Sequence, residues 1–314
     1  MFEKALKRFL SFLLTLLLVS VAVFAALEAS GGDSSSVVLS DEATKAMVEE
    51  YRMKAGLDDP FLVRYGAFLV SFLTLDWGST VGGKSIRTVL SSRLPVTLAL
   101  AFWSMLFSFV FSLFFSLKAV EKKNGKTDHA LSFLSSLFLV LPSFLSSLVL
   151  VLVFSFGLRL FPVAGYSPLK YGFLFHFRTL FLPSLTLALL HSSFMMRIYR
   201  EALEENLSMP FATAQLGKGM KEKELPLRSA LKPSLTVILP VLGESLASAL
   251  GGAAVVENVF ALPGLGSLLV QSALSRDVKT SGIVLLLVAL MVSVVFLLTD
   301  CLSAFVDPRG GRER

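Results

Sequence analysis

Long apolar stretches separated by polar segments form the main pattern of this 314-residue chain. A helix needs roughly 20 apolar residues to cross about 30 Å of hydrocarbon. Four stretches meet that need without a charged residue, and two more contain one acidic residue each. The pattern therefore predicts six membrane-spanning helices, over residues 9–27, 94–117, 130–158, 179–196, 233–256 and 280–306.

The first stretch could instead be the apolar core of a signal peptide, because Lys4, Lys7 and Arg8 precede it. It is longer than the usual core of roughly 7 to 15 residues. The sequence that follows, Glu-Ala-Ser-Gly at 28–31, is also a poor cleavage site. We therefore favour an uncleaved first helix.

Composition supports the membrane assignment. The chain is 54% hydrophobic and 17% charged, with a mean hydropathy of +0.73, which is far more apolar than a soluble domain requires. Most of its 29 Lys and Arg residues fall in segments that are cytoplasmic if the N-terminus is inside, most densely at 197–232. We therefore expect both termini in the cytoplasm. The net charge of +6 fits cytoplasmic-leaflet lipid and gives no indication of nucleic-acid binding.

The longest polar segment, residues 28–93, predicts an extracytoplasmic loop subdomain. Residues 44–56 have the pattern of an amphipathic helix. Residues 78–85, GSTVGGKS, match a phosphate-binding loop. That loop requires a strand–loop–helix unit with a downstream acidic strand, whereas the surrounding sequence predicts membrane helices. We interpret the match as chance.

A second polar segment, 199–232, interrupts the apolar second half of the chain. Ser208 can cap a helix and Pro210 suits its first turn, while Gly217 and Gly219 favour its end. A short helix is therefore predicted over 209–216. It carries no charge, so a soluble partner could bind its surface.

Several short motifs along the chain resemble those of ABC importer permeases, in particular the first permease subunit of dipeptide, oligopeptide and nickel uptake systems. In the second half these are the segment 199–232, which resembles the cytoplasmic coupling loop of such permeases, the run LGGAAVVENVFALPGLG at 250–266, Arg276-Asp277 and Asp307-Pro308-Arg309. The first half contributes Gly56-Leu57-Asp58, Asp76-Trp77-Gly78-Ser79 and the run RLPVTL at 93–98. The resemblance covers nearly the whole chain.

The resemblance implies an all-α integral membrane protein that forms half of a translocation pathway for di- or oligopeptides, in a prokaryotic inner membrane. Its parts would be a cytoplasmic N-terminus and first helix (1–27), the outer subdomain (28–93), a five-helix permease core (94–306) and a cytoplasmic tail (307–314). Nickel chelates and oligosaccharides are alternative solutes. No catalytic residue, metal or cofactor is expected, because a separate chain would hydrolyse ATP.

The implied partners are a second homologous permease, two ATP-binding subunits, an extracytoplasmic substrate-binding protein and membrane lipid, without nucleic acid. The residues implied for ATPase coupling are Phe211, Ala212, Ala214, Leu216 and Gly219. Those implied for the translocation path or gate are Gly243, Glu244, Gly251, Gly252, Glu257, Pro263, Gly264 and Gly266.

The fifth predicted span contains small residues at spacings of three and four, which allow close helix approach or leave room for a pathway. Glu244 lies in its middle, where a carboxylate is costly unless it faces a polar cavity or takes a proton. We expect it to face the subunit interface or the pathway. The turn at 262–266 has two glycines able to adopt positive φ. By resemblance it is an outer re-entrant piece, and a plain structural turn is the alternative.

Two other classes of function fit the sequence less well. An ion-coupled secondary transporter would need paired carboxylates in the membrane, and only Glu244 lies mid-span, with Asp300 near an inner end. A membrane protease would need a nucleophile with a base or a zinc motif, and neither is present. His191 lies in the fourth span and is interpreted as a packing residue rather than a substrate or proton ligand.

Overall fold

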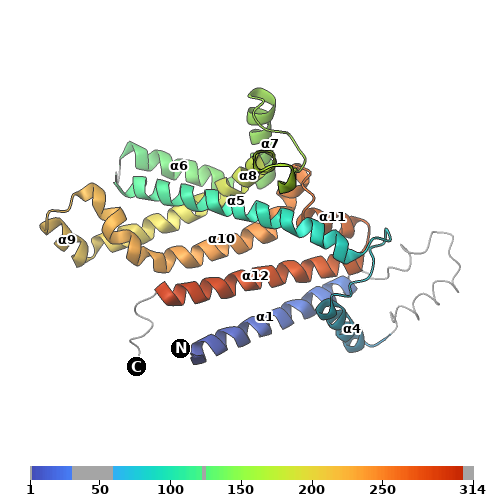
Figure 1. The fold of residues 1–314 in the computed structure, drawn as a ribbon. Coiled ribbons are helices and arrows are strands. Elements are labelled where there is room, and N and C mark those ends of the chain that lie inside the picture. The colour runs from blue at the N-terminus through green and yellow to red at the C-terminus, as the bar shows by residue number, and fades with distance from the viewer. Residues whose placement is uncertain (1, 30–58, 122–124, 307–314) are drawn as a thin grey trace. The chain divides into compact units, whose positions relative to one another are not determined.

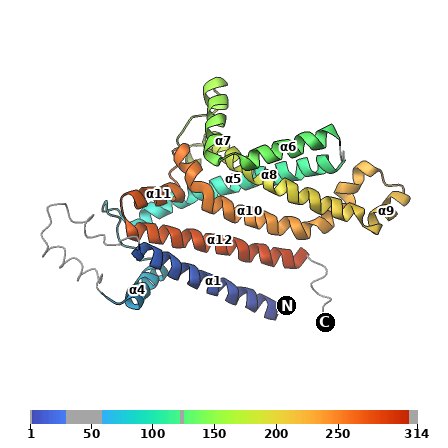
Figure 2. The same ribbon diagram turned by 180° about the vertical axis from the view of Figure 1, so that it is seen from behind.

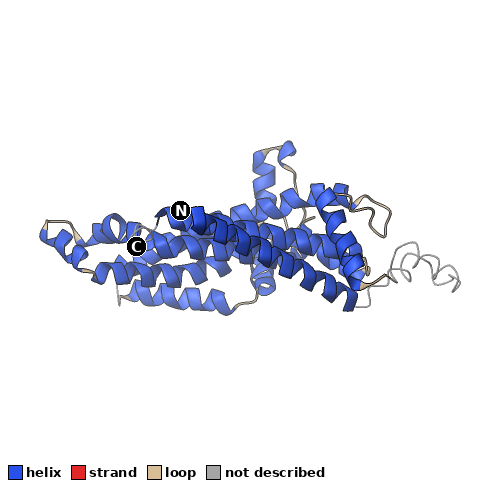
Figure 3. Cartoon of the chain, turned by 90° about the horizontal axis from the view of Figure 1, so that it is seen from below, coloured by secondary structure: helices blue, strands red, loops and turns tan. Residues whose placement is uncertain are grey.

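The computed structural model describes residues 2–29, 59–121 and 125–306. Over these residues the ordered elements are helices, and Figure 3 draws no strand. The all-α class predicted from the apolar stretches is therefore confirmed for the part of the chain described. The amphipathic helix predicted at 44–56, the motifs at 56–58 and 307–309 and the tail lie outside the described residues.

Within the described residues, five helices are long and apolar enough to cross a membrane. They match five of the six predicted spans, and each contains the whole apolar stretch that predicted it. They are α1 (Phe2–Ala29), α5 (Ile86–Glu121), α8 (Phe173–Ser208), α10 (Leu231–Val259, preceded by the π-helical turn Pro226–Ala230) and α12 (Val278–Val306).

The third predicted span, 130–158, is broken. Helix α6 (Lys126–Val140) and the segment Ser143–Gly157, which contains α7 (Ser143–Leu150), meet at a bend of 110°. Pro142 forces the residue before it out of the helical region, and Leu141 accordingly has φ −69° and ψ 123°. The apolar stretch 130–158 therefore does not form one continuous helix, and its assignment as a single span stays a prediction. Among the described residues the number of spans is five, or six if the bent pair counts as one.

The helices fall into two compact units, each with its own core. The first unit comprises residues 1–97 and 263–293, and so contains α1, α4 (Phe61–Thr74), the start of α5, α11 (Leu265–Leu274) and most of α12. Its core joins residues from both ends of the sequence: Trp77, Ile86, Leu90, Leu265, Leu268, Ile283 and Val284. The division of the chain at residue 93 stays a prediction, while core residues from both sides of it pack together.

The second unit comprises residues 98–262 and 294–314. Helices α6, α8 and α10 lie side by side in it, as Figures 1 and 2 both show. Its main core cluster contains Met105, Met195, Tyr199, Ile238 and Val241. The Tyr199 hydroxyl donates to the Ile238 carbonyl at 3.3 Å, which ties α8 to α10. The short helix α9 (Pro210–Gly217) extends beyond the ends of these helices (Figure 1).

Candidate functional site

Helix α9 forms where the sequence predicts a short helix between two long ones, with a different start. Met209 is its N-cap residue and Pro210 occupies its first turn. Ser208 is instead the last residue of α8, and its hydroxyl donates to the Glu205 carbonyl at 2.7 Å. Serine readily satisfies itself on a carboxyl-terminal carbonyl of its own helix. The prediction that Ser208 caps α9 is therefore wrong.

The end of α9 is set by Gly219, which has φ +88°. The Gly219 amide donates to the Leu216 carbonyl at 2.9 Å, and the Met220 amide donates to the Gln215 carbonyl at 3.2 Å. This pair of bonds is the Schellman arrangement, in which the left-handed residue is usually glycine. Gly217 is the last helical residue rather than the stop. Gly219 thus shapes the loop through its backbone.

The predicted coupling residues point in two directions. Phe211 and Leu216 are 40% and 36% exposed, and Ala214 is also exposed. Ala212 is 1% exposed, because α9 rests on α8 and on the turn Pro226–Ala230. The free surface of α9 is therefore apolar and centred on Phe211, while Ala212 anchors the helix to its own chain. Whether a partner binds this surface stays a prediction.

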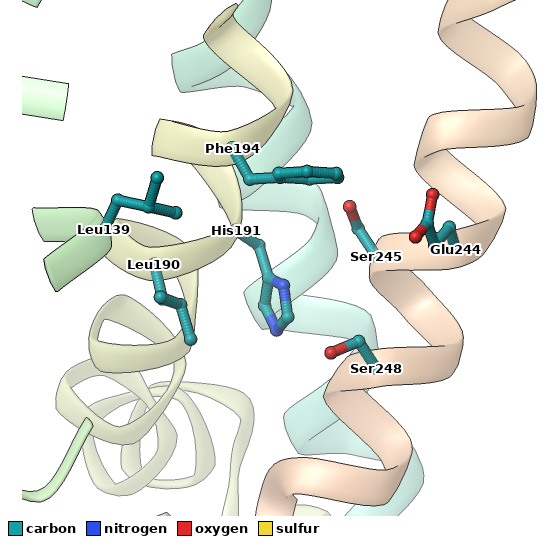
Figure 4. A pocket seen from close by; sticks show the side chains of 7 residues that line it. All are labelled: Leu139, Leu190, His191, Phe194, Glu244, Ser245 and Ser248. Atoms are coloured by element: carbon teal, nitrogen blue, oxygen red, sulfur yellow. The ribbon is translucent and has the colours of Figure 1, made fainter. Parts of the chain in front are cut away.

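A cavity of about 270 Å³ lies between α8 and α10 in the second unit, with Leu139 of α6 at its edge. Figure 4 shows Ser245 and Ser248 of α10 directing their hydroxyl oxygens toward the α8 residues His191 and Phe194. His191 is 6% exposed and Ser245 is 1% exposed. The remaining lining residues are Leu190 and Glu244. His191 therefore lies on a cavity, which the sequence around it did not reveal.

The glycines predicted to line the path divide into two groups. A side chain at Gly243 would meet Thr299 of α12, whose Oγ1 lies 2.2 Å from the position of an added Cβ. Gly243 is therefore a close helix contact. Gly251 and Gly252 are exposed, and an added Cβ there would meet no atom within 4 Å. With Glu244, which is also exposed, they lie on a face of α10 that its own unit leaves uncovered.

Glu257, in the last turn of α10, is more buried than a gate residue in contact with an open path would be. Glu257 is 0% exposed. Its carbonyl accepts the Leu262 amide at 2.7 Å, and the residue that takes the left-handed conformation in this turn is Ala261, with φ 50°. Gly264 has φ −99° and Gly266 is not among the residues of positive φ. Neither glycine therefore uses its capacity for positive φ, because the turn closes three residues earlier, at Ala261.

The start of α11 is held by polar contacts within the first unit. Gly264, buried, is its N-cap residue, and Pro263 before it is exposed. The Leu265 amide donates to Thr97 Oγ1 at 2.8 Å. Arg93 donates to the Gly264 carbonyl at 3.5 Å, and it reaches Ser267 Oγ at 3.2 Å and Gln271 Oε1 at 3.1 Å. The sequence marked Arg93 and Thr97 only through a motif, and it gave no sign of Ser267 or Gln271.

The loop at 78–85 does not present a phosphate cradle. The Val81 amide donates to Asp277 Oδ2 at 3.0 Å, and Ser79 pairs with Ser85 in an isolated bridge. The Thr80 and Gly83 amides also donate to carbonyls of the loop itself, so these three amides do not converge on a free phosphate site. Among the described residues, no three His, Cys, Asp or Glu side chains gather as metal ligands.

Comparison with known families gives the class of the chain. Residues 116–311 match the family described as binding-protein-dependent transport system inner membrane component. Residues 1–101 match the family of N-terminal parts of membrane components of such systems. The chain belongs to this family. It is therefore a membrane component of a transport system rather than an enzyme.

Relatives agree along the whole chain. A probable peptide ABC transporter permease of Sinorhizobium fredii (y4tP) is 30% identical over 97% of both chains. The oligopeptide transport system permease AppB of Bacillus subtilis is 30% identical over 94% of both. The dipeptide transport system permease DppB of Lactococcus lactis is 28% identical over 98% of this chain and 99% of its own. The resemblance predicted from the motifs is confirmed.

Among solved structures, a crystal structure of an amino acid ABC transporter with histidines is 19% identical. It covers 71% of this chain and 94% of that one at a TM-score of 0.49.

Proposed function

We propose that this chain is a permease subunit of an ABC importer for di- or oligopeptides and forms half of its translocation pathway. The observation that carries the proposal is full-length similarity, at 30% identity over 97% of both chains, to a relative named as a peptide transporter permease. Other relatives of comparable coverage are named for oligopeptide, dipeptide and glutathione transport. Peptides are therefore the favoured solute, ahead of nickel chelates and oligosaccharides.

The proposed energy source is a pair of separate ATP-binding subunits that act on α9. The exposed apolar surface of Phe211, Ala214 and Leu216 supports this role. A helix of eight residues with so little core of its own is stable only when held at both ends. The Gly219 turn and buried Ala212 provide that support, so that movement of a bound ATPase is passed to α8 and α10.

The proposed pathway side of this chain is the uncovered face of α10. Glu244, Gly251 and Gly252 recur there at helical spacing, and all three are exposed. A carboxylate against acyl chains is unfavourable. We therefore place this face against a homologous second permease or the pathway between the two. The buried Glu257 and the turn at Pro263, Gly264 and Gly266 would take part only after a conformational change.

The proposed orientation puts both termini in the cytoplasm of a prokaryotic cell, with α9 inside and the 78–85 loop outside. A substrate-binding protein would then dock on the outer segments. Ion-coupled secondary transport has no observation in its favour, because the family is defined by its dependence on binding proteins.

The test is uptake of a radiolabelled dipeptide by vesicles reconstituted with this chain, its paired permease, the ATPases and the binding protein. Accumulation of the dipeptide is expected only when ATP is supplied on the side of the membrane that carries the ATPases. The binding protein must be present on the opposite side. A proton ionophore should leave it unchanged. Uptake that proceeds without the ATPases and collapses with the ionophore would contradict the proposal and favour secondary transport.

A further inference from the structure

The cavity between α8 and α10 is lined by polar groups without a partner among the described residues, on His191, Glu244, Ser245 and Ser248. The Ser245 hydroxyl is buried without a hydrogen bond. No hydrogen bond to the ring nitrogens of His191, and no ion pair or hydrogen bond of the Glu244 carboxylate, occurs within the described ranges. Buried polar groups are nearly always satisfied in native proteins, and the exceptions need an explanation. The Ser245 hydroxyl and the His191 ring are the buried members of this group, and the exposed Glu244 carboxylate lies on the same cavity, so the cavity points to a ligand.

The chemistry of these groups favours a cationic donor. An ionised carboxylate only accepts hydrogen bonds, and a serine hydroxyl can accept as well as donate. A neutral imidazole offers one acceptor nitrogen. The only formal charge on the cavity is that of Glu244, which repels a carboxylate or phosphate and attracts an ammonium group. A primary ammonium has three N–H donors and no acceptor, which suits a lining made of acceptors.

The other side of the cavity is apolar. Leu139, Leu190 and Phe194 line it opposite the serines (Figure 4). Its volume of about 270 Å³ is below the roughly 300 to 1,000 Å³ typical of pockets that enclose a whole small molecule. The cavity therefore suits one end of a ligand, an ammonium group with an apolar group attached next to it.

We propose that Glu244, Ser245 and His191 form a subsite that binds the free amino terminus of a peptide in passage, with the first side chain against Leu190 and Phe194. The proposal rests on the proposed function and adds to it the part of the solute that this chain recognises. Since Glu244 also lies on the uncovered face of α10, the subsite opens toward the proposed pathway.

The first experiment compares uptake of a dipeptide with that of its N-acetylated form, in the reconstituted transporter with the binding protein unchanged. The ratio of the two rates is measured for the wild type, Glu244→Gln and Ser245→Ala. Loss of a charge-assisted hydrogen bond to the ammonium should reduce the preference for the free amino terminus by about tenfold in Glu244→Gln. Ser245→Ala should reduce it less, because a neutral hydrogen bond is weaker. Any selectivity of the binding protein cancels, because it is the same in every variant.

Two residues of α8 outside the cavity provide matched controls. Ser184 of α8 is also a buried hydroxyl without a hydrogen bond, but it does not line the cavity. Glu201 of α8 is an exposed carboxylate away from it. Ser184→Ala and Glu201→Gln should keep the wild-type ratio. A ratio that changes equally in Ser184→Ala and Ser245→Ala would overturn the subsite, because the effect would then be general to helix packing.

The second experiment places the ligand directly. A dipeptide with photo-leucine as its first residue is irradiated in the working transporter, and the adducts are mapped by mass spectrometry. Adducts on Leu190 or Phe194 that diminish in Glu244→Gln support the subsite. Adducts found only outside the cavity overturn it, even where uptake is normal.

Different results would overturn the proposed function and the subsite. A wild-type transporter with no ATP-dependent dipeptide uptake overturns the proposed function and the subsite with it. Normal ATP-dependent uptake with an unchanged ratio in Glu244→Gln overturns the subsite alone. In that case Glu244 serves another purpose, such as an ion pair with the second permease.

Discussion

The side-chain carboxylate of Asp277 accepts a hydrogen bond of 3.0 Å from the backbone amide of Val81, 196 residues earlier in the chain. The same carboxylate accepts the Thr280 amide at 3.0 Å and the Thr280 hydroxyl at 2.7 Å. Asp277 is 6% exposed. One buried side chain therefore begins α12 and fixes the turn that precedes α5, which joins the two ends of the sequence in the first unit.

Asp277→Ala is expected to lower the unfolding midpoint of the purified chain in detergent. It removes a helix cap, which costs about 1 kcal/mol. It also leaves the Thr280 and Val81 donors without their acceptor, at about 1 to 3 kcal/mol for a buried group. Asp76→Ala, at an exposed carboxylate five residues before Val81, is the control and should leave the midpoint unchanged. Equal shifts in the two variants would contradict the assignment.

Asp277 also illustrates which parts of the structure the sequence could predict. Membrane spans, α9 and the family depend on local sequence. Apolar length predicted the spans, a proline and two glycines predicted α9, and short motifs predicted the family. The contact of Asp277 with Val81 depends on the tertiary fold, which the periodicity of neither segment encodes. The His191 cavity has the same cause, because its apolar and polar walls come from different helices.

Local sequence signals were misleading where a residue can adopt either of two favourable arrangements. Ser208 has a good N-cap sequence, yet its hydroxyl bonds to the helix that it ends. Gly264 and Gly266 can adopt positive φ, yet Ala261 does so, because the turn closes on the Glu257 carbonyl. The stretch 130–158 has the apolar length of one span, yet the chain bends by 110° where Pro142 interrupts it. The sequence therefore indicates which conformations and hydrogen bonds a residue can adopt, and tertiary packing determines which of them it adopts.

Gly243→Ala is expected to destabilise the contact between α10 and the end of α12. The added Cβ would lie 2.2 Å from Thr299 Oγ1 and 2.7 Å from Thr299 Cβ, so the helices must move apart. Overpacking of this kind costs typically about 1 to 3 kcal/mol. Thermal unfolding of the purified chain measures it, and Gly243→Ala combined with Thr299→Ala should recover part of the loss.

Gly251→Ala on the same helix is the control for that measurement. An added Cβ there meets no atom within 4 Å. Replacing a helical glycine by alanine should then raise stability by up to about 1 kcal/mol. A destabilisation in Gly251→Ala as large as in Gly243→Ala would show that the close approach of Gly243 to Thr299 is not the cause.

The proposed topology predicts the labelling of engineered cysteines in a Cys301→Ser background. Cysteines at Asn124 and Gly311 are expected to resist an impermeant thiol reagent in intact cells and to react after permeabilisation. A cysteine at Gly82 is the outer control, because this position is exposed and has room for a side chain. Labelling of Asn124→Cys or Gly311→Cys in intact cells would contradict the proposed orientation.

Phe211→Asp is expected to uncouple the permease from its ATPase. Phe211 is 40% exposed on α9, and burial of such a side chain against a partner contributes roughly 1.5 to 3 kcal/mol. Since interfaces concentrate their energy in a few aromatic anchors, the aspartate loses that burial and adds a charge that must be desolvated. The variant should still insert and pair with the second permease, but it should retain little ATPase in a pull-down and show no substrate-stimulated hydrolysis.

Phe211→Leu, which keeps an apolar side chain, is the control and should keep much of the ATPase retention and of the stimulated hydrolysis. Wild-type ATPase retention and uptake in Phe211→Asp would show instead that the exposed phenylalanine of α9 lies on the membrane surface, and that α9 transmits force through its backbone and Leu216.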